Sequence, residues 1–282
     1  HHRNSGTWRI CKKSKSSCEE GSCKKSASEK STGKKIIMQA IILAAGFGTR
    51  LKPLTDHTPK ALVKCAGKCM IDHAIAYLES YGFDRIIINV HHFGGQIIDH
   101  INSNKYKSEI LISDERAELK DTGGALVFAL PLMNDEKSIL IFNTDVITNL
   151  DLHELASAHN SSDSSATLIA QERKSTRKLV FNAENHLIGW HNYKTEESIG
   201  DINDVPESSF FAFSGIHMID RSLVERFAEM YGDKPFPMIP AYLSCINEVN
   251  IQAYKAGKDT VWLETGSQER LKDAEEWLMS RK

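Results

Sequence analysis

The sequence lacks any long uninterrupted apolar stretch. Hydrophobic residues make up 41% of the 282 residues, yet no run approaches the roughly 20 apolar residues needed to cross a bilayer. The printed sequence also lacks the secretory pattern of a basic start, an apolar middle and a small-residue cleavage site. We therefore expect a cytoplasmic protein with no membrane partner.

The chain has little net charge of either sign. Its formal charge of -2 gives no bulk attraction for nucleic acid, so we expect no nucleic-acid partner. The average hides an asymmetry, because ten basic and three acidic residues lie within residues 1–35. We predict a disordered or tag-derived basic tail over 1–37 and a single domain over 38–282. The alternative is a native basic tail for an acidic partner or a membrane surface.

The six cysteines show no zinc-binding spacing. Three of them, Cys11, Cys18 and Cys23, lie in the basic tail, and Cys65 and Cys69 are four residues apart with no second pair nearby. Unpaired thiols are typical of a reducing compartment, which agrees with a cytoplasmic location.

An apolar run that stops at a small, glycine-containing loop organises the rest of the chain. Residues 36–43 predict a buried parallel strand. Gly46 and Gly48 then let backbone amides approach anionic oxygens, and Arg50 and Lys60 can neutralise phosphate charge. The six-residue glycine pattern of dinucleotide sites and the Gly-Lys-Ser/Thr of kinase-type loops are both missing. Solvated basic residues after an ordinary turn are the alternative.

Strands and helices alternate after this loop. Helical spacing covers 71–81 and 95–101, and strands are predicted at 85–90, 109–113 and 138–143. This order favours a doubly wound, mostly parallel sheet that binds ligands beyond the carboxyl ends of its strands.

Two further motifs fall at ligand-facing positions of this predicted sheet. Asp121-Thr122-Gly123-Gly124 can begin a helix and allow close approach to a ligand, or simply cap that helix. Asp145 follows the strand that ends at Asn143, and its carboxylate suits a hard divalent cation. The alternative is that Asp145 caps the helix that starts near Asp151.

The segments Leu43–Leu51, Pro53–Thr55 and Thr58–Leu62 resemble the motif of sugar-1-phosphate nucleotidyltransferases, and further matches extend to about Gly266. The resemblance implies an α/β, Rossmann-like (GT-A-like) fold, a mostly parallel mixed sheet flanked by helices. It also implies transfer of a nucleoside monophosphate from an NTP to a sugar 1-phosphate, with Mg²⁺ as cofactor. A homodimer is compatible with it.

The resemblance assigns roles to individual residues. Arg50 would hold the leaving phosphates, Lys60 the α-phosphate, and Asp145 with Glu264 the Mg²⁺; Arg50, Lys60 and Asp145 are thus the expected catalytic residues. The expected nucleotide-binding residues are Leu43, Ala44, Ala45, Gly46, Gly48, Thr49, Thr122, Gly123, Gly124 and Asn143.

Three positions depart from the family pattern. Thr144 replaces the usual glycine before Asp145, and Glu264 stands where the family has aspartate, so Glu264 either keeps the metal or weakens the site. The family's sugar-phosphate lysine is either shifted to Lys194, at the start of a predicted mobile loop over 194–208, or lost. Gly215 leaves room for the sugar or marks a bulge in a core strand.

Among relatives, the sequence is most similar to short members that act on N-acetylmuramate 1-phosphate with UTP, or on mannose 1-phosphate with GTP. Glucose 1-phosphate and phosphocholine are further candidate acceptors. A catalytically weak protein that binds sugar nucleotides for regulation is an alternative function. A metal-dependent glycosyltransferase of related fold is disfavoured because the chain lacks the Asp-x-Asp pattern.

Overall fold

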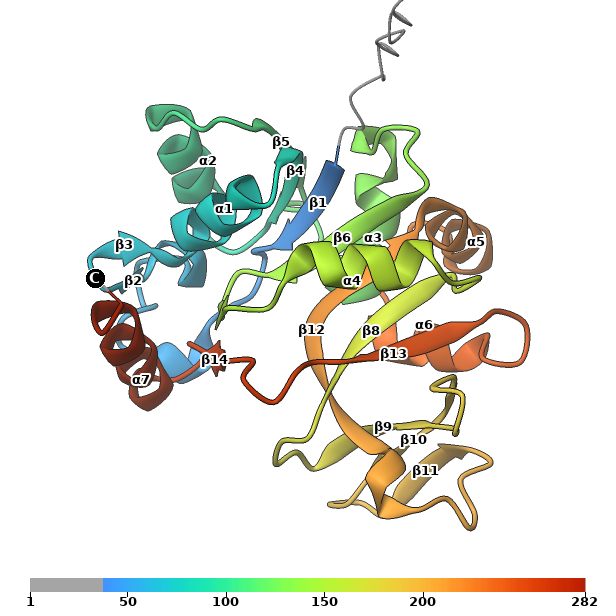
Figure 1. Cartoon of the computed structure of the whole chain (residues 1–282). Coiled ribbons are helices and arrows are strands. Elements are labelled where there is room, and N and C mark those ends of the chain that lie inside the picture. Colours follow the sequence, from blue (N-terminus) through green and yellow to red (C-terminus); the bar gives the residue numbers. More distant parts are fainter. Residues whose placement is uncertain (1–37, 282) are drawn as a thin grey trace, which may run out of the picture. The chain divides into compact units, whose positions relative to one another are not determined.

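A computed structural model describes residues 38–281 (Figure 1). The predicted tail over 1–37 and its three cysteines lie outside these residues. The strands are β1 (Met38–Leu43), β2 (Lys64–Cys65), β3 (Lys68–Cys69), β4 (Phe83–Val90), β5 (Glu109–Asp114), β6 (Ser138–Asn143), β7 (Val146–Thr148), β8 (Ala166–Gln171), β9 (Arg177–Phe181), β10 (Leu187–Asn192), β11 (Glu197–Gly200), β12 (Phe210–Asp220), β13 (Ile251–Lys255) and β14 (Trp262–Glu264). The α-helices are α1 (Met70–Ser80), α2 (Gly94–Ser103), α3 (Asp121–Ala129), α4 (Leu152–Asn160), α5 (Arg221–Tyr231), α6 (Met238–Ser244) and α7 (Gln268–Met279). The 3-10 turns are η1 (Thr49–Leu51), η2 (Lys60–Leu62), η3 (Leu130–Leu132) and η4 (Glu207–Ser209).

A mixed sheet forms the centre of the molecule. Its order is β11-β10-β9-β12-β6-β1-β4-β5, with β8 beside β12 and β13 beside β8. Strands β6, β1, β4 and β5 run parallel, and β12 joins this half antiparallel to β6. In Figure 1, β12 extends from the parallel half into the smaller section made by β9, β10 and β11. The predicted α/β class, a mixed sheet with parallel strands flanked by helices, is confirmed. The sheet is less parallel than predicted, because the pairings of β12 with β6, β8 and β9 and those of β10 with β9 and β11 are antiparallel.

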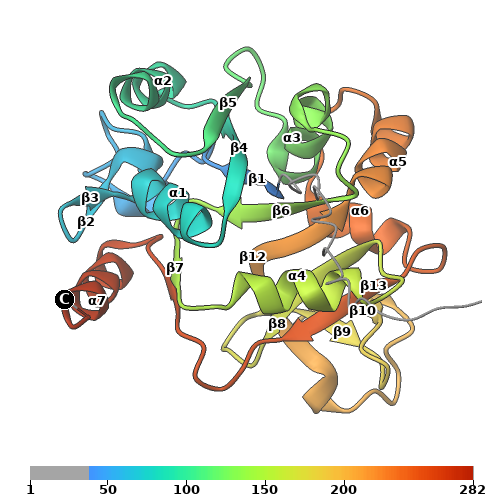
Figure 2. The same ribbon diagram turned by 45° about the horizontal axis from the view of Figure 1, so that its top comes forward.

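Helices cover both faces of the parallel half (Figure 2). Ile41 and its register partners Ile87 and Ile141 belong to the core cluster that includes the buried side chains of α3, α5 and α6. The next residue, Ile42, belongs to the cluster with α1, α2 and α4. This division follows from the alternation of side chains along a strand. Complete burial of each such side chain contributes roughly 1.5–3 kcal/mol.

Most predicted elements lie within one to three residues of their observed bounds, but the predicted mobile loop over 194–208 is wrong in two places. Residues Glu197–Gly200 form β11, which pairs antiparallel with β10, and Glu207–Ser209 form a 3-10 turn. Four-residue edge strands such as β11, exposed along its whole length, carry little hydrophobic pattern, so sequence alone gives them a weak signal.

A buried polar cluster ties the amino end of β6 to the end of β12 and to α4. Asp220 accepts hydrogen bonds from Ser138 Oγ (2.8 Å) and from His159 Nε2 (3.0 Å). Burial alone would raise the pKa of Asp220, but these hydrogen bonds and the neighbouring His159 and Lys137 hold the pKa below its ordinary value.

The Asp220 cluster should make the stability of the fold fall in acid. A carboxyl whose pKa is lower in the folded state stabilises the fold above its unfolded pKa, near 4, and loses that contribution as pH falls through the folded pKa. We expect the free energy of unfolding to decrease below about pH 4, and Asp220→Asn to flatten this part of the profile. Urea unfolding at several pH values measures both; an unchanged slope in the variant would contradict the assignment.

Candidate active site

The carboxyl ends of β1, β4 and β6 meet at one edge of the sheet. Leu43 at the end of β1 is in register with Asn89 of β4 and Asn143 of β6. The chain then enters the predicted phosphate loop, where Ala44 and Ala45 are buried. Beyond them, the loop becomes exposed, and the residues that face solvent are Gly46, Phe47, Thr49 and Arg50.

Lys60 and Asp145 form an ion pair at this edge. They are 85 residues apart in sequence, and each side chain is 18% exposed. Lys60 begins the η2 turn, and Asp145 lies between β6 and β7, one residue after Thr144. Thr144, the departure from the family glycine, is buried and bonds through its backbone N–H and its hydroxyl to the Leu43 carbonyl. The threonine therefore links the end of β6 to the end of β1 just before Asp145.

The C-terminal segment pairs with the chain at the same edge. Glu264 of β14 is in register with Val146 of β7, and the Thr265 N–H donates to the Asp145 carbonyl at 2.8 Å. A Cβ at Gly266 would lie 2.9 Å from Arg50 Nη2 and 3.6 Å from Asp145 Oδ2. Glycine at this position thus lets the backbone pass beside the Arg50 guanidinium and the Asp145 carboxylate. Glu264 lies two residues earlier, at the end of β14.

The Glu264 carboxylate is held by two arginines. Its Oε1 lies 2.9 Å from Arg173 Nη2, and its Oε2 lies 2.8 Å from Arg270 Nη1. Arg173 Nη2 also donates to the Phe213 carbonyl at 2.9 Å. Both oxygens of Glu264 therefore have a cationic partner, whereas Asp145 pairs with Lys60 through Oδ2 alone in the described part of the chain.

Gly215 brings β12 against Asn143. The register between β12 and β8 shifts between Phe213 and His217, so the predicted bulge is present. Gly215 has a φ of 74°, a left-handed conformation that other residues seldom adopt. A Cβ there would lie 2.2 Å from Asn143 Nδ2. The predicted acceptor-side glycine and a predicted nucleotide-side asparagine are therefore neighbours.

The Thr122-Gly123-Gly124 motif has partners inside the fold. The N–H groups of Gly123 and Gly124 donate to the Phe236 carbonyl at 2.9 and 3.1 Å, and Thr122 Oγ1 accepts from the Met238 N–H at 3.0 Å. The motif begins α3 as predicted, with Lys120 rather than Asp121 or Thr122 at the N-cap position. These two glycine amides are therefore occupied within the fold, and a nucleotide contact by this motif stays a prediction.

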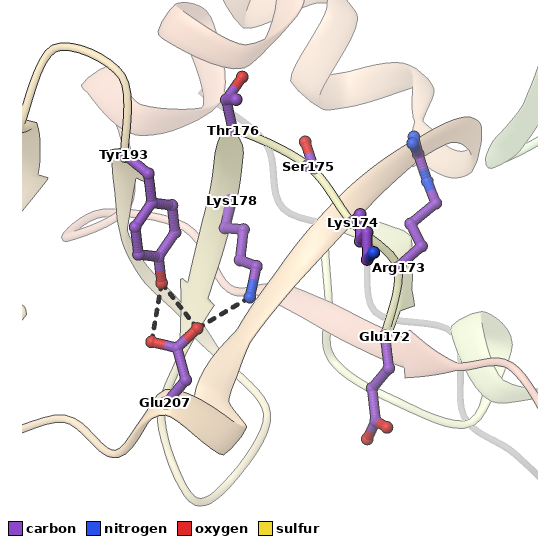
Figure 3. A pocket seen from close by; sticks show the side chains of 8 residues that line it. All are labelled: Glu172, Arg173, Lys174, Ser175, Thr176, Lys178, Tyr193 and Glu207. Atoms are coloured by element: carbon purple, nitrogen blue, oxygen red, sulfur yellow. Dashed lines mark hydrogen bonds and ion pairs between the residues drawn. The ribbon is translucent and has the colours of Figure 1, made fainter.

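Lys194 is exposed in the turn between β10 and β11, and its N–H bonds to Asn192 Oδ1. A cavity of about 700 Å³ lies beside this turn (Figure 3). In it, Tyr193 and Lys178 converge on Glu207, with Tyr193 Oη 2.7 Å from both carboxylate oxygens and Lys178 Nζ 2.9 Å from Oε1 (Figure 3). None of the predicted site residues lines this cavity.

Two buried residues at the site edge were not predicted from the sequence. Asn89 Oδ1 accepts from the Ala44 N–H at 2.7 Å, and Asn89 Nδ2 donates to Glu115 Oε1 at 2.9 Å. Burial raises the pKa of Glu115, although hydrogen bonds from Asn89 and from the Lys120 backbone oppose the rise. The one available signal was a polar asparagine inside an apolar strand.

Among residues 38–281, no helix has the length and apolar content that a bilayer span requires.

A family model described as nucleotidyl transferase matches residues 39–280. An N-acetylmuramate alpha-1-phosphate uridylyltransferase from Caulobacter vibrioides is 29% identical over 72% of this chain and 82% of its own length. One from Neisseria meningitidis is 42% identical over 40% of this chain and 49% of its own length. The catalytic subunit beta of mannose-1-phosphate guanylyltransferase from Dictyostelium discoideum is 31% identical over 52% and 42%.

Solved structures share the fold. HddC from Yersinia pseudotuberculosis, complexed with GMP-PN, superposes with a TM-score of 0.65 at 23% identity over 86% of this chain and all of its own. A Bacillus anthracis protein described as a glucose-1-phosphate thymidylyltransferase gives a TM-score of 0.70 at 18% identity over 85% and 94%. Together with the family match over nearly all the described residues, these findings confirm the resemblance seen in the sequence: the chain belongs to the nucleotidyl transferase family.

Proposed function

We propose that this nucleotidyltransferase transfers a nucleoside monophosphate from an NTP to a sugar 1-phosphate, releasing pyrophosphate. The observation that carries the proposal is the Lys60–Asp145 ion pair beside Arg50, at the carboxyl edge of the parallel strands. In α/β sheets this edge is where ligands bind. Cations and a carboxylate gathered there suit a reaction between anions.

The chemistry needs alignment and charge neutralisation rather than a general base. A phosphate oxygen of the sugar 1-phosphate forms a bond to the α-phosphorus, and the bond from that phosphorus to the β-phosphate bridging oxygen breaks. The attacking oxygen is already ionised at neutral pH, so no proton has to be removed. In this proposal, Lys60 meets the charge that develops on the α-phosphate and Arg50 binds the departing pyrophosphate.

Asp145 is the residue best suited to hold a divalent cation. Its Oδ1 accepts no hydrogen bond from any group within residues 38–281, and hard cations prefer such carboxylate oxygens. Glu264 fits the same role only after exchanging Arg173 or Arg270 for the ion. A bound Mg²⁺ would neutralise phosphate charge during transfer.

Glu264→Gln tests whether the Glu264 carboxylate binds the metal or only holds its two arginine partners. If Glu264 contributes to Mg²⁺ binding, the Mg²⁺ concentration for half-maximal turnover should rise about tenfold or more. A Mg²⁺ titration of pyrophosphate release, with thermal unfolding measured in parallel, gives the answer. A lower melting temperature with an unchanged Mg²⁺ requirement would show that Glu264 acts only with its two arginines.

The first substrate pair to test is UTP with N-acetylmuramate 1-phosphate, because the relatives from Caulobacter and Neisseria carry that name. Pyrophosphate release should be measured for four NTPs against the 1-phosphates of N-acetylmuramate, mannose and glucose and against phosphocholine, with the nucleotide product identified by mass spectrometry. One pair should give equal amounts of pyrophosphate and nucleotide product.

The double arginine contact of Glu264 favours one other function, a weakly active protein that binds sugar nucleotides for regulation. Binding of sugar nucleotides without Mg²⁺-dependent turnover of any pair would favour that function over the proposed one. Lys194 and Gly215 remain our candidates for the acceptor side in either case.

A further inference from the structure

A buried chain of hydrogen bonds joins the carboxyl ends of β1, β4 and β5 to the start of α3. The Ala44 N–H donates to Asn89 Oδ1 (2.7 Å), and Asn89 Nδ2 donates to Glu115 Oε1 (2.9 Å). Glu115 Oε2 accepts from the backbone N–H of Lys120 (3.1 Å), the N-cap of α3. The chain therefore connects the loop after β1 with the helix that carries Thr122.

These groups are removed from solvent and fixed in place. Asn89 is 3% exposed and Glu115 is 1% exposed. The Glu115 backbone is held as well, because its N–H donates to the Val90 carbonyl at 2.8 Å and its carbonyl lies 2.7 Å from His91 Nδ1. A buried polar group that loses its partner costs about 1–3 kcal/mol, so this chain of bonds resists rearrangement.

The direction of every bond is set by chemistry. A backbone N–H can only donate, so the Ala44 amide requires the carbonyl side of the Asn89 amide group. Asn89 then presents its NH₂ to Glu115, and the Lys120 amide presents a second donor. Glu115 must therefore accept at both oxygens, which an ionised carboxylate does and a glutamine cannot.

We propose that Asn89 and Glu115 are positioning residues for the nucleoside triphosphate. They fix the spacing between the Ala44 end of the phosphate loop and the start of α3, so the two segments are arranged before the nucleotide binds. The Ala44 amide is used by Asn89 and is unavailable to phosphate; the loop's exposed part, from Gly46 onward, is left to meet the nucleotide. This inference rests on the proposed function.

Glu115→Gln is the direct test. It places an NH₂ group opposite a donor, either Asn89 Nδ2 or the Lys120 N–H, and should raise the Kd for the NTP about tenfold or more. The KM for the sugar phosphate should change less than about twofold. Calorimetric titration of the full chain with each of the four NTPs and Mg²⁺, followed by kinetics with the tightest binder, measures both quantities.

Asp220→Asn is the matched control. Asp220 is also a buried carboxylate that accepts two side-chain hydrogen bonds, but it lies beside Ser138, the first residue of β6, at the opposite end of that strand from the site. The Asp220→Asn substitution should lower the melting temperature, while the Kd for the NTP stays within about twofold of wild type. A general loss of stability would affect both variants alike, so the difference reports on positioning.

A double variant restores the bonds with their direction reversed. In Asn89→Asp with Glu115→Gln, the new aspartate accepts from the Ala44 N–H and from the new glutamine NH₂, and the glutamine oxygen accepts from the Lys120 N–H. We expect its NTP affinity to return to within about threefold of wild type. Asn89→Asp alone sets two carboxylates against each other and should bind NTP more weakly than the double variant.

Two results overturn the inference: an NTP Kd that is unchanged in Glu115→Gln, or equal losses of NTP and acceptor affinity in that variant. Should Glu115→Gln not fold, the double variant decides, since weak NTP binding by a folded double variant contradicts the proposal. A wild-type chain that binds none of the four NTPs refutes the proposed function itself, and the inference with it.

Discussion

Asp145→Asn is expected to lower turnover about 10³-fold, the largest effect we predict for a single substitution. The asparagine keeps the shape of the side chain but removes its charge, so it can neither pair with Lys60 nor bind a divalent cation strongly. Loss of several kcal/mol of charge stabilisation during phosphoryl transfer corresponds to this range. Steady-state pyrophosphate release at saturating Mg²⁺ measures the effect.

The fold should survive this change, because the Asp145 side chain is partly exposed and its backbone contact with Thr265 remains. Thermal unfolding should therefore stay close to wild type. Asp220→Asn serves as the control, with a lower melting temperature and a nearly normal turnover. Turnover within about threefold of wild type in Asp145→Asn would remove Asp145 from the reaction.

Lys60→Ala is expected to reduce turnover about 10²-fold or more, since it removes a cation from the position where charge develops on the α-phosphate. Most of the loss should appear in kcat rather than in KM, because the interaction strengthens in the transition state. Lys60→Arg keeps the charge but changes its geometry, so it should recover part of the rate.

Lys137→Ala is the matched control for Lys60→Ala. Lys137 also lies beside an aspartate, with its Nζ 3.3 Å from Asp220 Oδ2, at the end of β6 remote from the site. Its removal should leave turnover within about twofold of wild type. A Lys60→Ala variant with the same modest effect would show that Lys60 only neutralises Asp145 in the resting protein.

Local patterns predicted the elements that carry the site. Each of these elements has a pattern of apolar residues that can be read within its own segment. They are the apolar run before Gly46, the helix predicted over 71–81 and the strand predicted over 138–143, and all three are present. The glycine at position 215 predicted a bulge, which the register of β12 shows. The contact of Gly215 with Asn143 depends on how β12 pairs with β6, which no local pattern states.

The unpredicted parts are long-range polar contacts. Asn89 lies 45 residues from Ala44, and Glu264 lies 91 residues from Arg173, so neither pairing leaves a trace in local periodicity. Glu264 could be aligned with a family position, but its two arginine partners could not. The tertiary fold decides which charged side chains come into contact. A sequence motif therefore identifies the residue types of a site better than it identifies the ion pairs that they form in the unliganded protein.

The most direct test of the account is to follow an NTP labelled at its α-phosphorus. In the presence of Mg²⁺ and the preferred sugar 1-phosphate, the wild-type chain should place the label in a sugar nucleotide and release unlabelled pyrophosphate, and Asp145→Asn should do so about 10³-fold more slowly. Label that appears in free nucleoside monophosphate, or transfer that continues undiminished in Asp145→Asn, would contradict an α-phosphorus transfer centred on Lys60 and Asp145.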